Sequence, residues 1–163
     1  MTEGSKPTTV SPALLRHAAS IVAGNQALAW ETEQKVLDAA RLERGVLAVL
    51  RDPAKGFYLV AVDEAGEVVG QLMVTYEWSD WRDGTFWWIQ SVYVVPPARR
   101  RGVYRALYQR ALEMAKADNG VCGVRLYVER KNTPAQATYE ALGMMRAHYE
   151  MFEVDFVLGS ELA

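Results

Sequence analysis

The stretch VYVVPPARRRGVYRALY, residues 92–108, limits the fold of this chain more than any other. Residues 85–95 form an apolar run rich in aromatic and β-branched side chains, and the run ends at a proline pair. After three arginines and Gly102, apolar residues recur at the spacing of a helix. The sequence therefore predicts a buried strand, a tight turn and a helix whose first turn is rich in arginine.

The turn between this strand and helix has the features of a phosphate-binding loop. The first N–H groups of a helix have no partner inside the helix and carry the positive end of its dipole, so they bind anions directly. Gly102 lets the backbone come close to a phosphate, and arginines add charged, multidentate donors. We expect a pyrophosphate here, and the alternative is an ordinary solvated helix start. The arginines are Arg99, Arg100, Arg101 and Arg105.

A second motif lies downstream, in NTPAQATYEALGM, residues 132–144. It holds an asparagine, a tyrosine seven residues later and then a leucine-glycine pair. Together with the loop at residues 99–104, this pattern resembles the GCN5-related N-acetyltransferase (GNAT) superfamily. The cofactor loop of that family reads Arg or Gln, two residues, Gly, one residue, then Gly or Ala, and Tyr104 departs from it at the last place. The resemblance covers about residues 57–156 well and the N-terminal third weakly.

The resemblance implies an N-acetyltransferase that moves the acetyl group of acetyl-CoA to an amine by direct attack in a ternary complex, with no metal. It assigns the pyrophosphate to the arginine-rich loop and the pantetheine to the backbone at the end of the preceding strand. The residues that it assigns to acetyl-CoA are Val92, Tyr93, Val94, Arg99, Arg100, Arg101, Gly102, Val103, Tyr104, Arg105, Asn132 and Tyr139.

The length and the pattern of apolar residues predict one domain of fold class α/β (α+β), residues 1–163, with residues 1–10 flexible, and the resemblance implies that it is an acyl-CoA N-acyltransferase domain. Ser11-Pro12 is typical of the start of a helix, which we expect over residues 13–29. Asp38 is typical of the N-cap residue of a second helix. The chain should form a mixed, mostly antiparallel sheet flanked by helices, and the resemblance implies a central parallel pair splayed for acetyl-CoA. Predicted strands are residues 57–62, 67–76, 85–95, 121–129 and 146–157, with later helices at 101–117 and 134–142.

Acetyl transfer to nitrogen needs an uncharged amine, a polarised carbonyl and a proton for the departing thiolate. Tyr139 matches the family tyrosine beside the cofactor sulfur, and its usual pKa near 10 keeps it protonated as a donor. The alternative is a helix tyrosine with only a packing role. No carboxylate lies in residues 85–95, so the candidate bases are Glu77 and Asp80 in the preceding loop, or Glu31 and Glu33 between the N-terminal helices, unless the amine arrives neutral.

The acceptor site is expected where acids and tryptophans alternate in EWSDWRDG, residues 77–84. Ring faces and carboxylates together bind cations, so we expect a small cationic amine. The alternative is that Trp87 and Trp88 lie on opposite faces of a strand, one in the core and one at an interface. The candidate acceptor residues are Glu31, Glu33, Glu77, Asp80 and Trp88.

Composition excludes several other classes of protein. A formal charge of −2 with one triplet of arginines argues against a nucleic-acid partner, and no apolar run is long enough for a membrane span or signal peptide. Cys122 is the only cysteine, so the chain can form no internal disulfide or cysteine zinc cluster. We expect a cytoplasmic protein with a small-molecule partner, and the sequence leaves a homodimer open.

The main alternative to an enzyme is a catalytically silent acyl-CoA-binding or sensor module on the same fold, because a fold does not determine a function. The sequence does not distinguish the two readings. Release of free thiol with a panel of amines would indicate the enzyme, and ligand binding without turnover would indicate the sensor.

Overall fold

The computed structural model describes residues 8–158, which form two units, residues 8–127 and residues 128–158. The predicted flexibility of residues 1–10 falls mostly outside the described residues; within them, Thr9 and Val10 lie in a strand. Within residues 8–158, no helix combines the length and the apolar character needed to cross a membrane.

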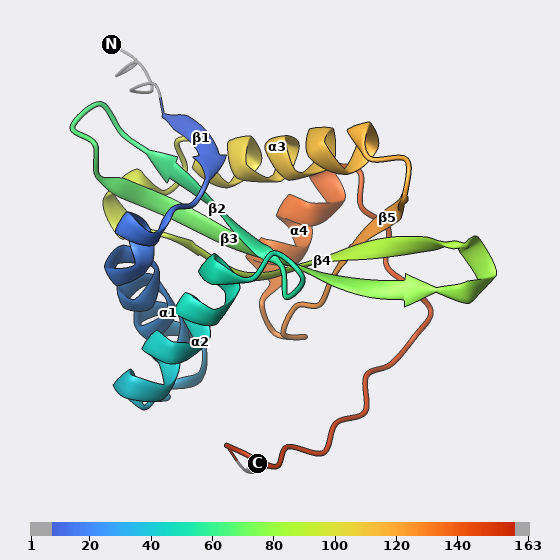
Figure 1. The fold of residues 1–163 in the computed structure, drawn as a ribbon, viewed down its shortest axis with the longest axis horizontal. Helices are drawn as coiled ribbons and strands as arrows, with labels where there is room; N and C mark the ends of the chain where they lie inside the picture. Colours follow the sequence, from blue (N-terminus) through green and yellow to red (C-terminus); the bar gives the residue numbers. More distant parts are fainter. Residues whose placement is uncertain (1–7, 159–163) are drawn as a thin grey trace. The chain divides into compact units, whose positions relative to one another are not determined.

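The first unit is built on a five-stranded sheet in which the strands neighbour one another in chain order (Figure 1). Each neighbouring pair is antiparallel except the last, β4 and β5, which is parallel. The predicted mixed, mostly antiparallel sheet is therefore confirmed, with its parallel pair at one edge of these five strands. The strands are β1 (Thr9–Pro12), β2 (Phe57–Val62), β3 (Val68–Ser79), β4 (Gly84–Val94) and β5 (Val121–Leu126).

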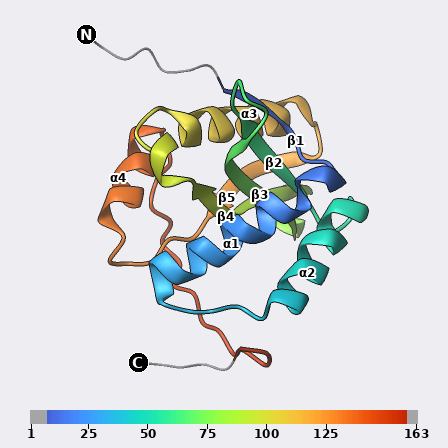
Figure 2. The ribbon, with the colours of Figure 1, turned by 90° about the vertical axis from the view of Figure 1, so that its left-hand side faces the viewer.

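Helices cover both faces of this sheet. The side chain of Gln71 on β3 hydrogen-bonds Asn25 of α1, whereas a Cβ at the neighbouring Gly70 would meet side chains of α3. Since successive residues of a strand point to opposite faces, α1 and α3 lie on opposite faces. In Figure 2, α1 and α2 lie below the strands and α3 above them. These helices are α1 (Ala18–Glu33), α2 (Ala39–Arg51) and α3 (Val103–Ala117).

The unit has an apolar core on each face of the sheet. On the α1 and α2 side, Tyr58 and Val60 of β2 pack with Ile21 and Val46. On the α3 side, Leu59 and Ala61 of β2 and Leu107 of α3 are fully buried. Two packed cores fix the position of β4 and of the first turn of α3, where the candidate site lies.

The second unit contains one helix, α4 (Thr133–Ala141). Asn132 caps its N-terminus by accepting a hydrogen bond from the Ala135 N–H at 3.2 Å. The helix stops at the leucine-glycine pair because Gly143 takes the left-handed conformation, with φ 87°, that glycine adopts without strain. Residues 144–158 form no helix or strand among those described.

Three sequence predictions of local structure are wrong. Ser11 and Pro12 do not begin a helix but lie in β1, where Ser11 pairs with Val60 of β2. Residues 30–33 do not form a junction but continue α1 to Glu33. The predicted strand at residues 146–157 is absent from the described residues, and many of its apolar side chains, such as Phe152, are exposed.

Candidate functional site

The last part of β4 has one open edge. The pairing of β4 with β5 ends at Ile89 and Leu126, although β4 itself continues to Val94. Beyond that point, β4 pairs only with β3 among the strands of residues 8–127, so its other edge presents backbone N–H and C=O groups without a strand partner. Extended ligands bind to such edges through backbone hydrogen bonds.

A β-bulge lies where this open edge begins. Gln71 pairs with Tyr93 and Met73 pairs with Gln90, so two β4 residues lie opposite the single intervening β3 residue. One of the two is Ser91, whose φ of 49° is rare for a residue with a side chain. Bulges end strand pairing and redirect the chain, which explains why β4 leaves β5 at this place.

The chain then enters the arginine-rich loop and α3. A short 3₁₀ turn, Pro96–Ala98, follows β4, and Arg100 and Gly102 adopt left-handed conformations with φ 61° and 79°. Gly102 is the N-cap of α3, and no side chain caps this helix end. The first N–H groups of α3 therefore lack the side-chain acceptor that commonly satisfies them.

The geometry of this helix end suits a phosphate group. A Cβ at Gly102 would meet no heavy atom within 4 Å, so open space lies beside the loop backbone. Arg100, Arg101 and Arg105 are exposed around it and supply positive charge. Val103 is buried and anchors the helix, while the Tyr104 ring packs against the Tyr108 ring with centroids 6.2 Å apart.

Arg99 is bound differently from the other loop arginines. Its Nε donates to the Val94 carbonyl at 2.8 Å, and its Nη2 lies 2.6 Å from the Glu31 carboxylate at the end of α1. The Tyr93 hydroxyl donates to the other oxygen of Glu31 at 2.9 Å. Burial and this hydrogen bond raise the pKa of Tyr93, so it remains a donor. These contacts tie α1, the end of β4 and the loop together.

Glu77 belongs to a second polar cluster and lies within β3, not in the loop predicted for residues 77–84. Its carboxylate accepts hydrogen bonds from the Trp88 indole N–H on β4 and, at 3.0 Å, from Arg125 on β5. The Arg125 guanidinium carbon lies 3.6 Å from the centroid of the Phe86 ring. Glu77 thus joins three strands on the sheet face that α1 covers elsewhere.

Glu31 and Glu77 contact β4 at different positions along the strand. Glu77 pairs with Phe86, five residues before the bulge at Ser91, which corresponds to about 16 Å along a strand. Glu31 instead bonds Tyr93, two residues beyond Ser91. The contact of Glu31 with β4 therefore lies beyond the bulge, and the contact of Glu77 with Trp88 lies before it.

The other candidate acceptor acids lie at exposed positions. Glu33 ends α1 and forms an ion pair with Lys35 at 2.8 Å. Asp80 lies in a 3₁₀ turn at the tip of the β3–β4 hairpin, where its carboxylate accepts the Trp81 N–H at 2.9 Å (Figure 1). Glu33 and Asp80 each contact a residue within two positions in the sequence, whereas the carboxylates of Glu31 and Glu77 contact residues of other elements.

In the second unit, Asn132 and Tyr139 lie on one helix. Asn132 is the N-cap residue, and its side-chain oxygen is engaged with the helix backbone. Tyr139 is half-buried, and burial raises the pKa of its hydroxyl above the ordinary value of 10.0. Tyr139 is therefore protonated at neutral pH, as a proton donor must be.

The sequence reasoning missed Arg125 and the Gln71–Asn25 pair. Arg125 stands among apolar residues in CGVRLYV, residues 122–128, and a lone arginine in a strand is the signal that could have drawn attention to it. Gln71 is likewise a polar residue inside an apolar strand. Among residues 8–158, no three His, Cys, Asp or Glu side chains are grouped so that they could hold a metal ion.

Comparison with known proteins gives one family and close relatives. A family model described as the acetyltransferase (GNAT) family matches residues 14–144. A mycothiol acetyltransferase of Corynebacterium aurimucosum is 34% identical over 122 residues, which are 73% of this chain and 40% of that protein. A mycothiol acetyltransferase of Corynebacterium kroppenstedtii is 33% identical over 138 residues, 77% of this chain and 38% of that protein. The chain thus spans about two fifths of the length of these curated relatives.

Solved structures agree with this assignment. The crystal structure of a possible acetyltransferase from Clostridium difficile 630 is 43% identical in sequence, with a TM-score of 0.85. The match covers 92% of this chain and 98% of the Clostridium difficile chain. At this level of identity and coverage, the architecture described above is shared over almost the whole length of both chains.

Proposed function

Because the chain belongs to the acetyltransferase (GNAT) family, we propose that it transfers the acetyl group of acetyl-CoA to the nitrogen of a small amine. The observation that carries this proposal is the continuous path from the open edge of β4 to the uncapped start of α3. A long ligand that has amides at one end and a pyrophosphate at the other finds matching groups along this path.

The residues of this path fit acetyl-CoA. Backbone groups of Val92, Tyr93 and Val94 would bind the pantetheine, and the N–H groups from Gly102 onward would bind the pyrophosphate. Open space beside Gly102 supports this, because a phosphate needs close approach to the backbone. Arg100, Arg101 and Arg105 would add charge, while Arg99 would hold the loop through Glu31. Asn132 would shape the start of α4.

We assign the proton donor to Tyr139. In the proposed step the neutral amine nitrogen attacks the thioester carbon, the carbon–sulfur bond breaks, and the departing thiolate takes a proton. The raised pKa of Tyr139 supports this role, because the group holds its proton throughout the neutral range. The nitrogen loses its extra proton to solvent or to a carboxylate.

The acceptor would lie on the sheet face that carries Glu77 and Trp88 and that faces α1, whose last turn carries Glu31. Each carboxylate already accepts two hydrogen bonds, but a carboxylate offers about four lone-pair sites, so either can still bind an ammonium group. A small-molecule acceptor is supported by the relatives named mycothiol acetyltransferase. Glu33 and Asp80 would contribute at the rim through their exposed charge.

Turnover with a panel of small amines, followed by release of free thiol from acetyl-CoA, tests the proposal. The panel should include the amine acceptor of mycothiol acetyltransferases, neutral amines and a peptide N-terminus. Thiol release that depends on a small amine supports the proposal. Saturable acetyl-CoA binding without thiol release from any amine would favour the silent acyl-CoA-binding module.

A further inference from the structure

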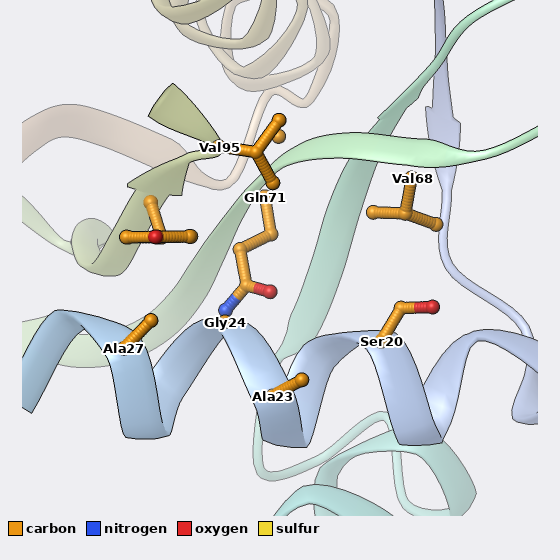
Figure 3. Close-up of a pocket in the computed structure, with 9 residues that line it drawn as sticks. Ser20, Ala23, Gly24, Ala27, Val68, Gln71 and Val95 are labelled. Carbon is orange, nitrogen blue, oxygen red and sulfur yellow. The ribbon is translucent and has the colours of Figure 1, made fainter. Parts of the chain in front are cut away.

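A cavity lies between α1 and the sheet, on the face opposite α3 (Figure 3). Its volume is about 330 Å³, within the range of small-molecule pockets. Its lining includes Ser20, Ala23, Gly24 and Ala27 of α1, Gln71 of β3, and Tyr93 at the end of β4.

The hollow exists because small residues of α1 face it. Positions 20, 23, 24 and 27 share one face of α1 and carry only serine, alanine and glycine. Across from them lies the backbone of Gly70, whose Cβ position points to the other face of the sheet, toward α3. Ser20 and Ala23 are exposed and form the rim, whereas Gly70 and Gln71 are buried. No lining residue carries a charge, so the cavity suits a neutral ligand.

One buried polar group faces this cavity. Gln71 is only 2% exposed, and its Nε2 donates to Asn25 Oδ1 at 2.9 Å. Its Oε1 accepts no hydrogen bond from any of residues 8–158. In Figure 3 this oxygen lies on the side of Ser20, and a Cβ at Gly24 would come within 2.3 Å of it. Glycine at position 24 is therefore required for the amide to reach this place.

A hydrogen-bond chain fixes the orientation of the Gln71 amide. Burial raises the pKa of Tyr58, and a hydrogen bond from the Asn25 side chain opposes that rise. The carbonyl oxygen of Asn25 accepts the NH₂ group of Gln71, which leaves the Gln71 carbonyl oxygen for the cavity.

We propose that this cavity is a binding site for a small, neutral, largely apolar ligand that donates one hydrogen bond to Gln71 Oε1. An apolar body replaces water over the small residues of α1, which the hydrophobic effect favours. An N–H or O–H group satisfies the amide oxygen, which a purely apolar occupant would leave unpaired at a cost. A charged ligand finds no counter-charge among the lining residues.

An occupant of this cavity also contacts the side of Tyr93. The Tyr93 hydroxyl bonds Glu31, which in turn pairs with Arg99 of the arginine-rich loop. The ligand therefore acts on the loop that binds acetyl-CoA in the proposed function, and its presence changes acetyl-CoA affinity. This regulatory step rests on the proposed function, whereas binding at the cavity does not.

The test uses indole as the probe and 1-benzofuran, which has the same shape without the N–H, as its match. Two-dimensional NMR titration of the ¹⁵N-labelled chain should show saturable shifts at Gly24, Gln71 and Tyr93 with indole. Benzofuran should bind about 2- to 12-fold more weakly, the worth of one net hydrogen bond. Absence of saturable shifts at these residues overturns the site, and equal affinity for the two probes overturns the role of Gln71.

Matched substitutions on α1 distinguish an effect of filling the cavity from a general effect of a larger side chain on the helix. Ala23→Leu fills the rim, and Ala19→Leu adds the same side chain at an exposed position outside the lining. Indole binding should be lost in the first variant and kept in the second, and binding kept in both contradicts the assignment. Ala27→Leu replaces Ala23→Leu if the latter does not fold.

Acetyl-CoA affinity measured with and without saturating indole tests the regulatory step. A change in wild type that disappears in Tyr93→Phe, which keeps the ring but loses the hydroxyl, supports the coupling. Equal affinity in both conditions refutes the coupling. Failure of acetyl-CoA to bind at all refutes the proposed function instead, and the NMR titration still decides whether the cavity binds its ligand.

Discussion

Replacement of Gly102 by valine should damage the cofactor loop in two separable ways. Gly102 has φ 79°, and a β-branched residue held there costs about 1–3 kcal/mol. In a chain of this size, each kcal/mol lowers the Tm by about 2–4 °C, so we expect a drop of about 2–12 °C. A Cβ at this position meets no heavy atom within 4 Å, so the loss is conformational and not steric.

The second effect is on acetyl-CoA. A side chain in the open space beside the loop backbone would occupy the place of the pyrophosphate and remove charge-assisted hydrogen bonds worth about 1.5–3 kcal/mol. The dissociation constant for acetyl-CoA, measured by calorimetry, should then rise about 10- to 150-fold.

Gly66 provides a matched control for this experiment. It has φ 85° and likewise no heavy atom within 4 Å of its Cβ position, but it lies in the β2–β3 turn. Gly66→Val should lose stability to a similar extent and keep its acetyl-CoA affinity. A folded Gly102→Val protein with wild-type affinity would refute the assignment of this loop to the pyrophosphate.

Three further outcomes are expected. Tyr139→Phe should lower kcat about 100-fold with unchanged acetyl-CoA affinity, and full activity in this variant would leave Tyr139 only a packing role. Wild-type activity should persist up to about pH 10, the ordinary pKa of tyrosine, because burial raises the pKa of Tyr139. Glu77→Gln should lower kcat/KM for the amine without changing acetyl-CoA affinity, and wild-type amine kinetics in this variant would exclude Glu77 from the acceptor site. Glu31→Gln, which breaks the ion pair with Arg99, should lower both kcat/KM for the amine and the affinity for acetyl-CoA. Tyr58 has a raised pKa in the folded chain, so its contribution to stability is complete below about pH 10 and is lost as the pH rises through the folded pKa; chemical unfolding across this range should show a steeper loss in wild type than in Tyr58→Phe.

The family was predicted from two short motifs, and it is confirmed by the family model that matches residues 14–144. The motifs could be recognised in the sequence because their conformations depend on neighbouring residues. Asp38 caps α2 as predicted, by accepting the Arg41 N–H at 2.7 Å. The left-handed conformations of Gly102 and Gly143 are also local, and glycine in a turn reveals them. Such features can be read from a few neighbouring residues.

Features that depend on distant residues were not predictable in the same way. Ser11-Pro12 carries the local signals of a helix start, but pairing with the edge of β2 outweighs them. α1 continues to Glu33, and Glu31 near its end contacts Tyr93 and Arg99, which lie 62 and 68 residues further along the chain. No local pattern reveals such contacts.

The acceptor site shows the same division. Acids and aromatic residues drew attention to residues 77–84, yet β3 runs through Glu77 to Ser79 because these residues pair with the start of β4. Arg125, which engages Glu77, comes from a strand 48 residues away. The roles of Tyr139 and of the acidic residues in the reaction stay predictions.

Transfer of a labelled acetyl group tests the central claim most directly. The chain is incubated with acetyl-CoA carrying ¹³C in the acetyl group and with the amine that releases most thiol from the panel. We predict that the label appears in an amide of that amine, in an amount equal to the free CoA thiol formed. Unlabelled amine, with acetyl-CoA bound to the chain and intact, would contradict the proposed acetyl transfer.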